Sequence, residues 1–137
     1  MLRVLLFVFF TCLHSCSPVR EIIVKKKEGG RTVVVARTVL GPALVPGGVR
    51  FRVSPPAGTY SLTVAGTFNQ WDPTVSILTN NPRLRVWEGM VIMPHKGKIH
   101  FKYIRNGRDW MVDPYLETVA DGYGGKNSVF NLETAPR

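Results

Sequence analysis

The sequence has few of the residues from which enzyme and metal sites are built. Its 137 residues include two cysteines and three histidines, and the histidines at 14, 95 and 100 lack the spacing of a zinc site. No motif surrounds a serine or cysteine nucleophile, and the aspartates are scattered over turns rather than paired across a cleft as glycoside hydrolysis requires. We therefore expect a protein that is not an enzyme and that uses no metal or cofactor.

The two cysteines, Cys12 and Cys16, both lie near the start, so the chain after Cys16 can form no internal disulfide. Arg3 precedes a nearly unbroken apolar run, Val4–Leu13, which is shorter than the ~20 residues of a membrane-spanning helix. This pattern predicts a signal peptide over residues 1–16 and an exported, periplasmic or cell-surface protein. Leu-His-Ser-Cys, ending at Cys16, resembles a bacterial lipobox and predicts lipidation of Cys16 and membrane anchoring. Simple secretion, with cleavage at a neighbouring serine, is the alternative.

The 3.6-residue apolar period of a helix is also absent after the predicted signal peptide. Apolar and polar residues instead alternate in short stretches, such as Val49–Val53 and Ile99–Tyr103, with turn signals between them. Asn106-Gly107 is a strong hairpin signal because both central residues of a type I′ turn need positive φ. This pattern predicts an all-β fold, an immunoglobulin-like β-sandwich. The expected core residues are Phe51, Leu62, Val64, Phe101, Tyr103 and Phe130.

Positive charge is in excess, with a formal net charge of +9. Residues 17–47 are predicted to be a basic linker with a β-hairpin around Lys25, Lys26 and Lys27, and Gly47 marks its boundary. Such a segment beside a lipid anchor can contact anionic headgroups, at ~1 kcal/mol per basic residue. A solvated hairpin that aids solubility and a salt-sensitive surface adhesin are the alternatives. Nucleic acid is not an expected partner, because no recognition motif accompanies the charge.

Two of the three tryptophans, Trp71 and Trp110, lie in polar, turn-like contexts. A glucose ring has an apolar C–H face and a rim of hydroxyl groups, so a sugar site needs aromatic platforms beside polar side chains. Tryptophan offers the largest flat face, while Lys102 and Asn127 offer hydrogen-bonding groups. Strand alternation turns Lys102 outward if Phe101 faces the core.

Several separated motifs occur in an order that resembles carbohydrate-binding module family 48, which includes the glycogen-binding domain of the AMP-activated kinase β subunit. The resemblance covers Gly48 to Leu132 and implies an early-set immunoglobulin-like sandwich, placed at residues 48–133 and followed by a tail at 134–137. It also implies binding of α-1,4-glucan, or a related glycan, without cleavage. The motifs are Val64–Pro73, Trp87–Gly89, Lys98–Tyr103, Asn106–Trp110, Asp113-Pro114 and Asn127–Val129.

The resemblance assigns five ligand contacts. Trp71 and Trp110 match the stacking tryptophans, Lys102 matches the hydrogen-bonding lysine, and Asn127 matches the asparagine that contacts sugar hydroxyls. Tyr123 falls where the family often has an apolar residue that inserts at the glucan. These residues form the predicted site.

Two features depart from the family pattern. The turn before Trp110 is one residue longer than in many members, which predicts a displaced or rotated indole. The stretch around Tyr123 is rich in glycine. Trp87, by contrast, matches a packing position of the family. A protein-interaction or scaffold module with the same sandwich and no sugar binding is the alternative function.

Overall fold

The structure, a computed structural model, describes residues 21–93 and 96–135, without the side chains of residues 35 and 36. The predicted signal peptide and the predicted lipidation site Cys16 lie outside the described residues. All regular structure in the described part is β-strand, which confirms the all-β prediction. No helix in these ranges is long and apolar enough to cross a membrane.

Eleven strands are present in the described part of the chain. They are β1 (Glu21–Glu28), β2 (Arg31–Val39), β3 (Gly41–Val45), β4 (Gly48–Val53), β5 (Leu62–Gly66), β6 (Ile77–Asn81), β7 (Val86–Val91), β8 (Lys98–Arg105), β9 (Asp109–Met111), β10 (Thr118–Ala120) and β11 (Lys126–Asn131).

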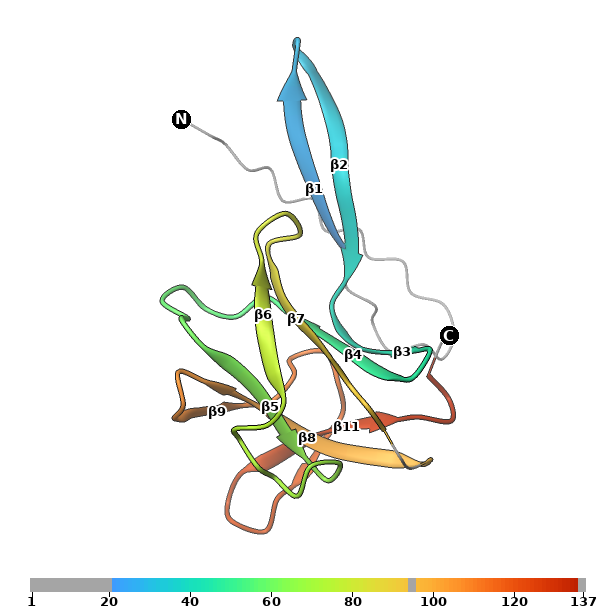
Figure 1. The fold of residues 1–137 in the computed structure, drawn as a ribbon, viewed down its shortest axis with the longest axis vertical. Coiled ribbons are helices and arrows are strands. Elements are labelled where there is room, and N and C mark those ends of the chain that lie inside the picture. The colour runs from blue at the N-terminus through green and yellow to red at the C-terminus, as the bar shows by residue number, and fades with distance from the viewer. Residues whose placement is uncertain (1–20, 94–95, 136–137) are drawn as a thin grey trace.

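Strands β3 to β11 form one curled, sandwich-like body (Figure 1). The order along the sheet is β10-β11-β8-β5-β6-β7-β4-β3, and β9 pairs with β8. Strand β6 connects the two layers, because Ile77 and Leu78 pair with β5 while Thr79–Asn81 pair with β7. The sheet therefore folds over on itself at β6 and encloses a core.

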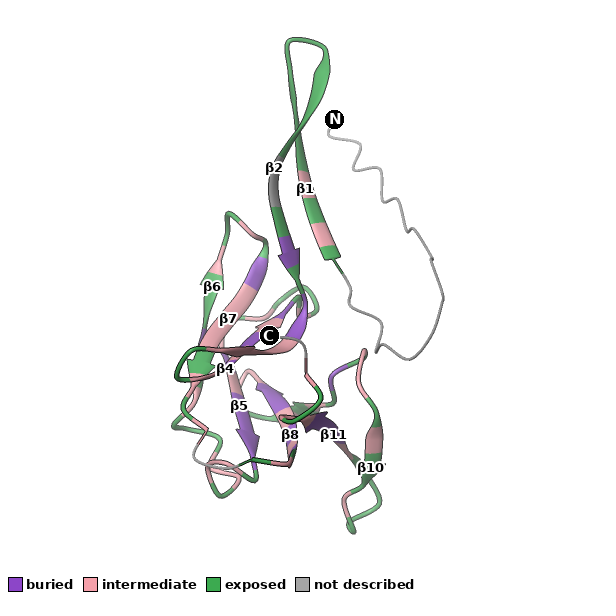
Figure 2. Ribbon diagram, turned by 90° about the vertical axis from the view of Figure 1, so that its right-hand side faces the viewer, coloured by how far each residue is buried: buried purple, intermediate pink, exposed green. Residues whose placement is uncertain are grey.

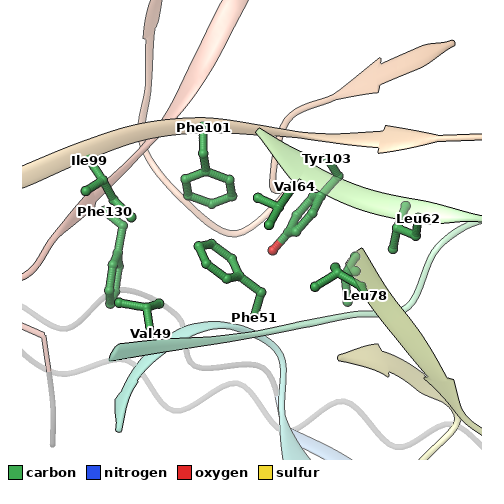
Figure 3. Packing of buried hydrophobic residues seen from close by; sticks show 10 residues of the cluster. Val49, Phe51, Leu62, Val64, Leu78, Ile99, Phe101, Tyr103 and Phe130 are labelled. Carbon is green, nitrogen blue, oxygen red and sulfur yellow. The ribbon is translucent and has the colours of Figure 1, made fainter. Parts of the chain in front are cut away.

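The core lies between β4 on one side and β5 and β8 on the other (Figure 3). The ring of Phe51 meets those of Phe101 and Tyr103 edge-on, with centroids 5.1 and 6.3 Å apart. All six predicted core residues are at most 8% exposed, so that prediction is confirmed. Alternation predicted them because strand side chains change face at every residue.

Two local expectations differ from the structure. Strand β3 lies in the segment that the sequence assigns to the linker, yet it pairs with β4 as an edge strand. An edge tolerates Pro42, which has no N–H to donate. Tyr60 alternates with Leu62 and Val64 in the sequence, a pattern that predicts one strand, yet Tyr60 is exposed and precedes β5. The side-chain oxygen of Asn106 accepts hydrogen bonds from the backbone N–H groups of Tyr60 and Ser61 and so holds that segment against the β8–β9 turn.

Strands β1 and β2 form a separate two-stranded hairpin that projects from the body (Figure 1). Most of its residues are exposed, and burial begins at its base with Thr38 and Leu40 (Figure 2). Gly29 and Gly30 make the turn with φ of 55° and 80°, values that glycine adopts without steric cost. The hairpin therefore gains little stability from the core.

Candidate functional site

The outward face of β8 brings together three of the five predicted residues. Trp110 of β9 is the cross-strand partner of Ile104, which lies two residues after Lys102. Directly opposed residues share a face, and so do residues two apart in a strand. On β11, Ser128 pairs with the core residue Phe101, so Asn127 points to the opposite side. Lys102, Trp110 and Asn127 therefore share the face that points away from the core.

This face has an apolar floor. Ala65, the cross-strand partner of Lys102, and Ile104 both point away from the core, yet they are 0% and 1% exposed. Other parts of the chain must therefore cover them. Trp110 is placed to do so, because opposed Cβ atoms lie ~5 Å apart. Trp110 is still 47% exposed, so it presents apolar surface to solvent on this face.

Trp71 lies in the loop between β5 and β6, which Asn69 holds in shape. The Asn69 side-chain oxygen accepts a 2.9 Å hydrogen bond from the N–H of Gly66. Its amide nitrogen donates to the carbonyl of Val64 at 3.0 Å and to the hydroxyl of Ser76 at 3.1 Å. One side chain thus ties together both ends of the loop.

The backbone at Trp71 has an uncommon conformation. Gln70 and Trp71 have φ of 57° and 60°, in the left-handed region that non-glycine residues rarely adopt. The N–H of Trp71 donates a 2.9 Å hydrogen bond to the carbonyl of Gly66. The loop therefore fixes the point from which this half-buried indole projects.

Strand pairing gives an approximate distance between the backbone that holds the Trp71 loop, at Gly66, and the backbone of Trp110. Gly66, to which Trp71 is bonded, pairs with Phe101, three residues before Ile104 on β8. Three residues span ~10 Å along a strand, and β5 and β9 flank β8 at ~5 Å on each side. The backbones of Gly66 and Trp110 are therefore roughly 14 Å apart across the sheet. Lys102 belongs to the strand between them.

The third tryptophan is in a different environment. Trp87 of β7 is half-buried and packs against the core cluster, whereas Trp71 and Trp110 are not among the residues that do so in the described part of the chain. Trp87 also borders a shallow hollow between the β4–β5 loop and the β6–β7 turn, which none of the five predicted residues lines. A flat stacking platform needs no pocket, so we place the candidate site on the open face of β8.

Tyr123 lies at the tip of the loop that follows β10 and is 96% exposed. Asp121 organises this loop, because its Oδ1 accepts hydrogen bonds from the N–H groups of Tyr123 and Gly125 at 2.8 and 2.9 Å. A Cβ at residue 125 would lie 2.6 Å from Oδ2 of Asp121, so glycine here lets the carboxylate keep its position. The loop is thus closed around a single carboxylate.

The same carboxylate connects the loop to the face. Lys102 Nζ donates a 2.6 Å hydrogen bond to Asp121 Oδ2, and both side chains are largely buried. The Lys102 hydrogen bond, followed by that from the Tyr123 N–H, lowers the pKa of Asp121 from 3.8 to about 2. An ammonium has three donors, so this bond leaves Lys102 with donors for a ligand.

Sequence reasoning missed the roles of Asn69 and Asp121. An Asp-Gly pair is a signal for a side-chain-stabilised turn, and it marks Asp121 as a loop former. Its ion pair with Lys102 joins residues far apart in the chain, so no local pattern contains it. Asn69, by contrast, bonds to groups only three to seven residues away, in β5 and the loop that follows it.

Comparison with models of known protein families found no match to this chain, and comparison with curated proteins found none either. Within the described ranges, no group of three or more histidine, cysteine, aspartate or glutamate residues is arranged to hold a metal ion. A function for the chain therefore rests on the face of β8 and on the motifs of the sequence.

Proposed function

We propose that this chain is a non-catalytic carbohydrate-binding module that recognises α-1,4-glucan or a related glycan on the outward face of β8. Trp71 and Trp110 stack on sugar rings, Lys102 and Asn127 bind hydroxyl groups, and Tyr123 borders the ligand. The observation that carries the proposal is the half-exposed indole of Trp110 on the same face as Lys102, above a buried apolar floor.

The chemistry of this face suits a sugar. An indole attracts the slightly positive C–H hydrogens on one side of a pyranose. An ammonium donates to hydroxyl oxygens, and an amide both donates and accepts. An open face buries only part of a ligand, so we expect a Kd of ~1 mM to 10 μM, equivalent to about −4 to −7 kcal/mol. Binding of this strength suits capture or tethering.

We also propose that the body is an early-set immunoglobulin-like sandwich of the family that the motifs resemble. The curled two-layer sheet supports this, as does the position of Trp71 and Trp110 outside the core cluster. The lipobox-like motif supports an exported protein anchored through Cys16. Mass spectrometry of the mature N-terminus tests the anchor, because a lipidated Cys16 and an unmodified, cleaved chain differ in mass.

Retention on insoluble starch or glycogen tests the binding proposal. We expect the double variant Trp71→Ala/Trp110→Ala to lose at least ten-fold in affinity. Trp87→Phe is the matched control, because it changes a tryptophan that packs inward and should leave retention unchanged. Equal retention of the wild type and the double variant would disprove the role of the two indoles. Circular dichroism of each variant checks that it is folded.

A second candidate function is a protein-interaction module without sugar binding. The outward face of β6 and β7 supports it, since Ile77, Met90 and Ile92 are all more than half exposed there. Continuing the β6–β7 register places Ile77 beside Met90. A glycan array with no binding, together with a protein partner that is lost on substitution of Met90, would favour this function over the first.

A further inference from the structure

The far half of the β1–β2 hairpin combines positive charge with exposed apolar side chains. Residues 25–34 include Lys25, Lys26, Lys27 and Arg31 against a single acid, Glu28. Lys26 pairs with Glu28 at 2.9 Å, while Lys25, Lys27 and Arg31 have no acidic partner within the described residues. Val33 and Val34 are exposed beside them.

The strand register distributes these groups over both faces of the hairpin. Lys25 pairs with Val34, and Lys26 pairs with Val33. Neighbouring pairs of an antiparallel ladder point to opposite sides. Each face of the far half therefore presents a lysine next to an exposed valine.

The hairpin is also incomplete as a folding unit. It is a two-stranded sheet to which no other described strand is added, and such hairpins are marginally stable in water. Its eight-residue strand β1 reaches ~26 Å from end to end, and the basic end is the one far from the body (Figure 1). The groups at this end are thus free to meet a partner that the body does not touch.

We propose that the end of this hairpin docks on a lipid bilayer that contains anionic lipids. The unpaired lysines and Arg31 meet headgroup phosphates, and the two valines enter the boundary between headgroups and acyl chains. A bilayer surface surrounds an inserted tip, which fits a tip with lysine and valine on both faces, whereas a folded protein would contact one face. A second copy of the hairpin would bring like charges together. This docking does not depend on glycan binding.

Vesicle co-sedimentation of the full chain tests the proposal, with vesicles of phosphatidylcholine alone and of phosphatidylcholine mixed with phosphatidylglycerol. At ~1 kcal/mol per basic residue, Lys25→Gln/Lys26→Gln/Lys27→Gln should weaken binding to the mixed vesicles on the order of 100-fold. The matched control, Lys96→Gln/Lys98→Gln/Lys126→Gln, removes the same charge from exposed lysines of the body and should change binding by no more than a few-fold.

Two further measurements separate the contributions of charge and apolar contact. Raising the salt from 0.1 to 1 M shortens the screening length from about 10 to 3 Å, so binding of the wild type should fall steeply. Val33→Thr/Val34→Thr keeps the charge and the β-branched shape and should weaken binding several-fold at either salt concentration.

Three results would overturn the proposal. One is that the two triple-lysine variants lose the same amount of vesicle binding, or that neither loses any. Another is equal binding to vesicles with and without phosphatidylglycerol. The third is equally tight binding of soluble polyglutamate, which would make an acidic polymer the partner. None of these outcomes affects retention on starch, so failure here is distinguishable from failure of the glycan proposal.

Discussion

Lys102 Nζ lies 2.6 Å from Oδ2 of Asp121, and this ion pair links the central strand of the candidate face to the loop that displays Tyr123. The carboxylate accepts from a side chain on one oxygen and from two backbone N–H groups on the other. Lys102 therefore has a structural partner as well as a proposed ligand. The loop position and the lysine position depend on each other.

This ion pair should show a pH dependence in acid. The pKa of Asp121 is lowered from 3.8 to about 2, chiefly by Lys102. A lowered pKa in the folded state means that the carboxylate stabilises the fold above about pH 4, and that this contribution is lost as the pH falls towards 2. An NMR titration of the Asp121 carboxyl carbon should give a midpoint near 2. In Lys102→Met the midpoint should move up, and an unchanged midpoint would show that the lysine is not the cause.

Asn69→Ala should destabilise the loop of Trp71. The substitution leaves the N–H of Gly66 and the carbonyl of Val64 without their side-chain partner, at a cost of about 1–3 kcal/mol. Urea unfolding measures this cost, and starch retention should fall because Trp71 loses its fixed anchor. Asn80→Ala is the control, since Asn80 is an exposed asparagine of β6. A loss of stability with full starch retention would show that the loop geometry does not govern binding.

Asp113 should give the opposite pH dependence. Burial raises its pKa, although hydrogen bonds from the Tyr115 N–H and the Tyr103 hydroxyl oppose the shift. A raised pKa means that the folded state holds the proton more tightly, so the contribution of Asp113 to stability is full below about pH 4 and is lost as the pH rises through the folded pKa.

Unfolding free energies measured across pH should therefore have a smaller slope in Asp113→Asn than in the wild type. Asp113→Ala should cost about 1–3 kcal/mol at neutral pH, because the buried Tyr103 hydroxyl loses its acceptor. The same pH slope in Asp113→Asn and the wild type would contradict the assignment of this dependence to Asp113.

The aromatic core should be sensitive to truncation. Phe51 is fully buried and its ring contacts those of Phe68, Phe101 and Tyr103. Phe51→Ala should lower the free energy of unfolding by about 3–5 kcal/mol, and Phe51→Leu by less. Tyr60→Ala, at an exposed position, should stay within about 0.5 kcal/mol. Chemical denaturation distinguishes these values, and similar losses at the two positions would contradict the observed burial.

Local chemistry was enough to predict the core and one turn. Phe101 and Tyr103 alternate with outward-facing residues over a full strand, so their burial follows from the period of two. Asn106 and Gly107 have φ of 54° and 73°, as the hairpin signal required. The longer turn does not take Trp110 out of register, because residues 106–108 form the loop and Trp110 still pairs with Ile104.

Other features could not be predicted because they depend on distant partners. In β6 only Leu78 is fully buried, with exposed Ile77 and Thr79 on either side, so the apolar pattern is too short to mark a strand. Strand β3 contains Pro42 and exists because β4 offers it an edge. The ion pair of Asp121 with Lys102 likewise appears only after β11 has paired with β8.

The change of pairing partner along β6, from β5 to β7, affects how the body can unfold. The two layers are joined through β6, which pairs with β5 at Ile77 and Leu78 and with β7 from Thr79 to Asn81, so they cannot separate there without breaking backbone hydrogen bonds of this five-residue strand. A force applied across the layers would concentrate on Leu78, where the pairing changes sides and the side chain enters the core. We expect mechanical unfolding to begin at Leu78 and to disrupt both layers together.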